Sequence, residues 1–174
     1  MQGGEIAIGG SYEDFLAQCG KSLLRLATAL AGNPTDGQDL LQNTLLKTWS
    51  AWSGVDATSR YAYVRRALVN ENISSWRSKS ARLALLTDMD DHPIPVDATD
   101  TIAMRDALER ALMQLTTNQR TAIVLRYVEG LSIAETADYM NCEVSTVKSH
   151  CFRGLELLRS SKHLRIVTVE VPDA

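Results

Sequence analysis

Small hydroxyl and basic side chains gather on one face of a predicted helix that begins near Ser145. Its apolar face is formed, at helical spacing, by Val147, Cys151, Leu155 and Leu158. The opposite face carries Ser145, Thr146, Ser149 and Arg153, with Lys148 at its edge. Side chains of these types exchange hydrogen bonds with base edges and phosphate oxygens in the major groove of DNA. We therefore predict that this helix binds DNA.

A shorter helix precedes it, so the stretch 131–158 has the pattern of a helix-turn-helix. Ser132 and Glu135 fit a capping box, and Asn141 and Cys142 interrupt the pattern before Ser145 opens the second helix. Any amphipathic helical pair could show this spacing, but a pair that only packs rarely leaves a face of hydroxyls and cations. The outward side chains favour DNA contact. Phe152 also leans outward, and we expect it to pack rather than to touch a thymine methyl group.

The charge is unevenly distributed over the 174 residues, of which 45% are hydrophobic. The net charge of −3 comes entirely from residues 79–104, which contain five aspartates and only two basic residues, Lys79 and Arg82. Six basic residues and the single acid Glu71 lie between Arg60 and Arg82, a local excess that attracts phosphates. The chain is thus predicted to fold into neutral halves with an acidic connection and a local basic stripe.

Helical periodicity predicts three helices in the first half and four in the second, without strands. Ser11 caps the first helix, which buries Phe15, Cys19, Leu23, Leu26 and Leu30 and ends at Gly32-Asn33-Pro34. For the second helix we predict a capping box of Thr35 and Gln38 and a buried face of Leu41, Leu45 and Trp49 or Trp52. A long helix runs from Ser59 past Trp76, which we expect in the core. In the second half, Thr116 and Gln119 form another predicted capping box before a helix that ends at Gly130.

Residues 86–101 contain Pro93 and Pro95 and a cluster of aspartates. The prolines are incompatible with a helix, so we predict an extended connection rather than a compact loop. The fold class we predict is all-α, with two small helical domains joined by an acidic flexible linker, the second containing the helix-turn-helix. The predicted divisions are a leader at 1–10, a domain at 11–85, the linker at 86–101, a domain at 102–160 and a tail at 161–174. The tail alternates apolar and polar residues and could be a strand, a docking segment or a disordered protease tag.

Several other functions find little support. Cys142, His150 and Cys151 match no common zinc spacing, and a fourth ligand is missing, so we predict no metal and no cofactor. Phosphate-binding loops, nucleophile elbows and paired catalytic carboxylates are absent from the sequence, which argues against an enzyme. No apolar run approaches the roughly twenty residues of a membrane span. With three widely spaced cysteines and no secretory leader, the expected compartment is the cytoplasm.

Three blocks of sequence resemble bacterial group IV sigma factors, also called extracytoplasmic-function sigma factors, and among them the actinobacterial SigE-like branch. Asp39-Leu40-Leu41-Gln42 through Lys47-Thr48-Trp49 resembles the core-binding helix of the second conserved region. The segment from Tyr63 to Asn70 resembles the helix that handles the minus-ten element. The segment from Leu115 to Ser149 is similar to the fourth conserved region. The helix-turn-helix alone is shared with LuxR-type response regulators, whereas both regions in this order are far more specific.

The resemblance implies a sigma factor that binds RNA polymerase core, directs it to promoters and helps open DNA. Contacts with core polymerase, on the clamp of the largest subunit, are then expected from Asp39, Gln42, Asn43, Lys47 and Trp49. Minus-ten DNA contacts are expected from Arg60, Tyr63, Arg65, Arg66, Asn70, Trp76 and Arg77. Minus-thirty-five contacts are expected from Ser145, Thr146, Lys148, Ser149 and Arg153. The flap of the second largest subunit and an anti-sigma factor are further partners that the resemblance implies.

Two alternatives remain at this point. One is a stand-alone helix-turn-helix regulator that binds DNA as a dimer without polymerase. The other is a helical adaptor that contacts only proteins, on which the basic stripe would be incidental.

Overall fold

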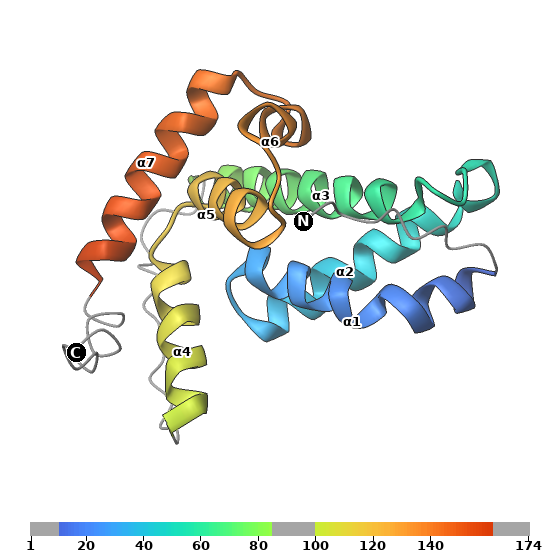
Figure 1. Ribbon diagram of the computed structural model, residues 1–174, viewed down its shortest axis with the longest axis horizontal. Coiled ribbons are helices and arrows are strands. Elements are labelled where there is room, and N and C mark those ends of the chain that lie inside the picture. Colours follow the sequence, from blue (N-terminus) through green and yellow to red (C-terminus); the bar gives the residue numbers. More distant parts are fainter. Residues whose placement is uncertain (1–10, 85–99, 162–174) are drawn as a thin grey trace, which may run out of the picture. The chain divides into compact units, whose positions relative to one another are not determined.

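The computed structural model describes residues 11–84 and 100–161, with the side chains of 77–84 and 100–106 left undescribed. Every regular element in those ranges is helical, which confirms the predicted all-α fold (Figure 1). The predicted leader, residues 86–99 of the predicted linker and residues 162–174 of the predicted tail lie outside the described residues, whereas Asp100 and Thr101, the last two residues of the predicted linker, are helical. Contacts group the chain into two compact units, Met1–Asn72 and Ile73–Ala174. The domain boundaries drawn from the sequence stay a prediction.

The first unit begins with the antiparallel pair α1 (Tyr12–Ala31) and α2 (Pro34–Trp49), which lie side by side (Figure 1). Ser11 caps α1 in a capping box with Asp14, and Gly32 ends it in the left-handed conformation at φ 93°. The predicted apolar row of α1 is buried along its whole length, at Phe15, Cys19, Leu23, Leu26 and Leu30. The sequence prediction for α1 is therefore confirmed.

Helix α2 differs from its prediction at both its cap and its buried face. Asn33 is the N-cap, accepting from the backbone N–H of Asp36, and Pro34 occupies the first helical position, so the predicted Thr35–Gln38 box is wrong. The buried residues of the helix are Gly37, Leu40, Thr44 and Thr48, whereas Leu41 and Leu45 are half-buried. Of the two tryptophans predicted as alternatives, Trp52 is buried and Trp49 is exposed. This register follows from Gly37, where a Cβ would lie 2.6 Å from the Cα of Thr28 on α1. Only glycine, which has no Cβ, allows so close a crossing at this position.

Helix α3 (Arg60–Ala84) follows a single 3₁₀ turn at Trp52–Gly54 and confirms the predicted long helix. Within the first unit it is tied to both earlier helices. The hydroxyls of Ser22 and Tyr61 lie 3.2 Å apart, and the Nζ of Lys47 donates to Oε2 of Glu71 at 2.5 Å. Val64 and Leu68 are fully buried. These contacts fix the face that α3 turns to solvent.

The second unit contains α4 (Asp100–Met113), α5 (Thr117–Ile123), α6 (Ile133–Met140) and α7 (Val144–Ser160). Thr116 and Gln119 form the predicted capping box of α5. The buried Arg120 donates from Nη1 to the carbonyls of Leu112 and Leu115, at 3.1 and 3.3 Å. It therefore ties the last turn of α4 and the residues that follow it to α5.

Between α5 and α6 the chain forms a five-residue π-helix, η2 (Val124–Val128), which the sequence did not predict. The backbone N–H of Glu129 donates to the carbonyl of Val124 at 3.0 Å, one residue further back than in an α-helix. Val124 and Leu125 are buried, while Tyr127 and Val128 are exposed. A guanidinium N–H of Arg126 donates to the carbonyl of Leu131 and braces the turn that follows.

Cys19, Cys142 and Cys151 are free thiols. Within 11–84 and 100–161, no group of three or more metal-ligating side chains comes together. None of the helices in these ranges carries an apolar stretch long enough to cross a membrane.

Candidate nucleic-acid interface

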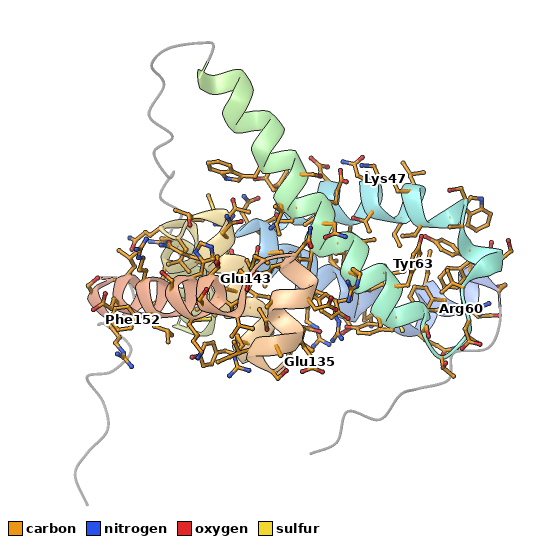
Figure 2. The ribbon with its side chains drawn as sticks, turned by 90° about the horizontal axis from the view of Figure 1, so that it is seen from above. Lys47, Arg60, Tyr63, Glu135, Glu143 and Phe152 are labelled. Carbon is orange, nitrogen blue, oxygen red and sulfur yellow. The ribbon has the colours of Figure 1, made fainter. Side chains whose placement is uncertain are left out.

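Helices α6 and α7 form the helix-turn-helix that the sequence predicts. Ser132 and Glu135 make the reciprocal capping box of α6, with bonds of 2.7 and 3.1 Å. The turn uses Asn141 in the left-handed conformation at φ 48°, which asparagine tolerates better than most residues. Helix α7 begins at Val144, one residue earlier than predicted, with Glu143 as its N-cap (Figure 2).

Helix α7 packs against α5 through a contact that the sequence analysis missed. Val147 is fully buried, as predicted, and Gly154 lies closest to α5, where a Cβ would come within 2.5 Å of Cδ1 of Ile123. Leu155 and Leu158 pack against the cluster of Leu112, Leu115 and Ile123. A glycine within an amphipathic helix was the signal for this close approach.

The outer face of α7 presents the predicted hydroxyl and basic side chains. Ser145, Lys148 and Arg153 are exposed, and Thr146 and Ser149 are partly buried. At helical spacing Ser145, Ser149 and Phe152 form one row, with Lys148 and Arg153 on opposite sides of it. Phe152 is 64% exposed, so our expectation that it packs is wrong (Figure 2). The face therefore combines hydroxyls, an exposed aromatic ring and two flanking cations.

His150 lies behind this face and makes the second unit sensitive to pH. Burial lowers the pKa of His150 below its usual 6.5, and the nearby Arg153 lowers it further. The folded state thus disfavours the imidazolium form of His150. Neutral His150 makes its full contribution to the free energy of unfolding above pH 6.5, and this contribution is lost as the pH falls through the lowered pKa. We expect the second unit to lose stability between pH 7 and 5, measured by chemical denaturation. His150→Gln should flatten that part of the profile; an unchanged slope would contradict the assignment.

On α3, three of the predicted DNA-contacting residues share one face. Tyr63, Arg66 and Asn70 follow one another at spacings of three and four residues, and Arg66 and Asn70 are exposed. This face lies opposite the buried Val64 and Leu68. Figure 2 shows Tyr63 on α3 one turn from Arg60. An aromatic, a cationic and an amide side chain are thereby aligned along the helix.

Two other predicted arginines stack on aromatic rings. The guanidinium carbon of Arg60 lies 4.6 Å from the ring centre of Trp52, and that of Arg65 lies 5.8 Å from the ring centre of Tyr61. Both distances fall within the range of cation–π attraction. These rings hold Arg60 and Arg65 beside the first unit's aromatic residues, apart from the row of Tyr63, Arg66 and Asn70.

The two remaining predicted residues on α3 are Trp76 and Arg77. Trp76 is 49% exposed, so the expectation that it belongs to the core is wrong. Asn72 and Ile73, four and three residues earlier on the same face, are buried, so the buried part of this face ends before Trp76. The side chain of Arg77 lies outside the described residues.

The loop before α3 is held in shape by Asp56. Its Oδ1 accepts from the backbone N–H of Thr58 at 2.9 Å and from the Thr58 hydroxyl at 2.5 Å. These bonds, the hydroxyl's foremost, lower the pKa of Asp56. These hydrogen bonds hold the conformation of the loop that leads into α3.

The outer face of α2 carries an apolar groove. A cavity of about 350 Å³ is lined by Tyr12, Gln42, Leu45, Leu46 and Trp49. Leu46 is 75% exposed and Trp49 is 55% exposed, and the ring of Tyr12 meets that of Trp49 edge-on at 4.7 Å. The predicted polar residues of this helix, Asp39, Gln42, Asn43 and Lys47, are all exposed. Sequence reasoning found Gln42 and Trp49 but missed Tyr12, Leu45 and Leu46, because it assigned Leu45 to the core.

Comparison with known families matches both units. Residues 15–82 match the family described as Sigma-70 region 2, and residues 105–158 match the one described as Sigma-70, region 4. With a helix-turn-helix in the second of these regions, the fold and its exposed faces define a transcription initiation factor of the sigma-70 class rather than a catalyst.

The RNA polymerase sigma-E factor of Streptomyces avermitilis is 34% identical over 155 residues, which cover 88% of this chain and 86% of that protein. The sigma-E factor of Streptomyces coelicolor is 34% identical over 149 residues, covering 85% and 84%. This chain belongs to the extracytoplasmic-function sigma factors and is SigE-like. It directs RNA polymerase to promoters, which removes the stand-alone regulator and the adaptor as alternatives.

Solved structures agree on the fold. The sigma factor RpoE in complex with the anti-sigma factor NepR from Bartonella quintana superposes with a TM-score of 0.63 at 23% identity, covering 92% of this chain and 98% of that one. CnrH in complex with the cytosolic domain of CnrY gives a TM-score of 0.58 at 22% identity, covering 88% and 90%.

Proposed function

We propose that three exposed helix faces divide the work of this sigma factor: the groove face of α2 binds core polymerase, the Tyr63 face of α3 handles the minus-ten element, and the outer face of α7 reads the minus-thirty-five element. The observation that carries the proposal is the α2 groove, in which large apolar side chains stand exposed among polar ones. Monomeric proteins rarely expose such a patch unless another protein covers it.

The partner we propose for the α2 face is the clamp of the largest polymerase subunit. Trp49 and Leu46 supply the apolar centre, and the polar rim consists of Asp39, Gln42, Asn43 and Lys47. An apolar centre with a polar rim is the usual anatomy of a protein interface. Lys47 also pairs with Glu71 of α3, so this rim is linked to the helix that carries the minus-ten face.

For the minus-ten element we propose that Arg66 holds phosphate, that Asn70 hydrogen-bonds a base taken out of the stack, and that Tyr63 stacks near it. Arg60, Arg65, Trp76 and Arg77 remain proposed contributors. Unstacking a base requires a few kcal/mol, and one aromatic stacking contact returns about 1–3 kcal/mol, so charge-assisted phosphate contacts can complete the exchange. The alignment of Tyr63, Arg66 and Asn70 supports this division of roles.

For the minus-thirty-five element we propose that Ser145, Thr146, Ser149 and Arg153 approach base edges and that Lys148 contacts phosphate. The exposed ring of Phe152 joins this face, where it could meet a thymine methyl group. The second unit is also proposed to contact the flap of the second largest polymerase subunit. An anti-sigma factor is a further proposed partner, because the two similar solved structures are complexes of this kind.

Reconstitution with core polymerase tests the whole proposal. The chain, core enzyme and a library of promoter fragments should give transcripts whose start sites share two upstream elements. The same chain without core enzyme should bind those fragments weakly. Tight binding to a single palindromic site by the chain alone would contradict the proposed division among three faces.

Arg153→Ala and Lys148→Ala should weaken promoter binding in different ways. Loss of a base contact at Arg153 should reduce holoenzyme binding by about 1–3 kcal/mol and relax the sequence preference at one minus-thirty-five position. Loss of a phosphate contact at Lys148 should weaken all sequences alike and reduce the salt dependence by about one counterion. Arg159→Ala, which removes an exposed cation from the last turn of α7, is the control. Equal effects of all three substitutions would overturn the assignment.

A further inference from the structure

One apolar stripe of α4 is covered over only part of its length. Ala111 and Leu112 are buried, as is Leu115 just after the helix, whereas Leu108, one turn before Leu112 on the same face, is 47% exposed. A leucine in line with a packed stripe is normally buried with it. The exposed side chain of Leu108 is therefore available for contact with a further segment.

The stripe loses its cover where α7 ends. Leu155 and Leu158 of α7 pack against the cluster of Leu112 and Leu115, and α7 stops at Ser160. Helix α4 continues past that end (Figure 1). Leu108 lies about 6 Å further along the helix axis than Leu112.

The chain leaves α7 in an inward direction. Ser161 is 4% exposed, and its Oγ is buried without a hydrogen-bond partner in the part of the chain that the structure describes. Its backbone N–H donates to the carbonyl of Leu158 at 3.2 Å. A buried hydroxyl normally has a partner, which a further segment of chain at this place would provide.

The residues after Ser161 are rich in β-branched side chains, which favour an extended chain. In such a chain Leu164 and Ile166 lie on one side, and Arg165, Val167, Val169 and Val171 lie on the other. An extended chain advances about 3.3 Å per residue, so Leu164 and Ile166 come within about 10–17 Å of Ser161. This distance spans the two turns of α4 that lie before Leu112.

We propose that residues 162–171 dock in extended form along α4, with Leu164 and Ile166 covering Leu108. The docked tail completes the packing of α4, the first helix of the unit that contains the helix-turn-helix. This contact is independent of the roles proposed for the three faces.

Hydrogen exchange of two chains tests the docking. The chain ending at Ser161 should exchange the backbone amides of α4 around Leu108 at least about tenfold faster than the full chain. The amides of α1 serve as the internal reference and should exchange at the same rate in both. Equal rates in α4 would overturn the proposal. The rates of the full chain should not change on tenfold dilution, and a dependence on concentration would overturn docking within one chain in favour of a second copy.

Single substitutions in the full chain keep the test specific. Ile166→Asp should reproduce the fast exchange of the shortened chain, because it places a charge against Leu108. Val167→Asp introduces the same charge on the opposite side of the extended segment and should leave α4 protected. Equal effects of the two substitutions would overturn the proposed alternation.

Discussion

Gly37→Ala is expected to destabilise the first unit by about 3 kcal/mol, at the upper end of what overpacking causes. The new Cβ would lie 2.6 Å from the Cα and 2.8 Å from the backbone nitrogen of Thr28. These are backbone atoms, so α1 and α2 must move apart as whole helices. In a unit of this size such a change lowers the melting temperature by about 12 °C or more, which calorimetry would detect.

Gly20→Ala is the matched control, because Gly20 also lies inside a helix of the first unit. Nothing lies within 4 Å of the position that its Cβ would occupy. Alanine there should raise stability by about 0.5–1 kcal/mol through its better helix propensity. Opposite signs for the two substitutions are expected; destabilisation by both, or by neither, would show that the α1–α2 crossing is not set by Gly37.

Leu46→Asp is expected to weaken association with core polymerase by about thirtyfold, or roughly 2 kcal/mol. Leu46 is the most exposed large apolar residue of the groove and has no role in the buried face of α2. An aspartate there leaves the isolated protein folded but would be buried without a partner in the complex. Titration of labelled protein with core enzyme measures the change.

The control for this experiment is Gln18→Asp, which adds the same charge at an exposed position of α1 that does not line the groove. Its affinity for core enzyme should equal that of the unchanged protein. Unfolding curves of both variants should match the parent within about 0.5 kcal/mol, as for most surface substitutions. An unaffected Leu46→Asp would remove the α2 groove from the polymerase interface.

Local signals in the sequence were sufficient for most of the fold. The cap of α1, the end of α1 at Gly32 and the boxes at Thr116 and Ser132 depend on neighbouring residues only, and all were predicted. The register of α2 was not predicted. Its periodicity favours Leu41 and Leu45 as the buried row, but the crossing at Gly37 turns Leu40 inward instead. That crossing depends on Thr28 of another helix, which periodicity does not describe.

The same limit applies to the candidate site. Hydrophobicity assigned Trp76 and Phe152 to packing positions, yet both are exposed. Apolar residues reserved for a partner look like core residues in a sequence, because the pattern does not say which surface will cover them. The outer face of α7 could be predicted because its polar side chains do not belong in a core. The apolar residues that complete the α2 groove could not be predicted, because their pattern is that of core residues.

The π-helix at Val124–Val128 has a consequence for how this protein tolerates change in length. Each residue added to or removed from a regular helix rotates everything after it by about 100°. Here one extra residue is accommodated within a single turn, and Tyr127 and Val128 face outward while α6 still enters at Ser132. Shortening this segment by one residue would therefore convert the turn to a regular α-helix and keep the phase between α5 and the helix-turn-helix, whereas an equal deletion inside α5 would rotate everything after it by about 100°.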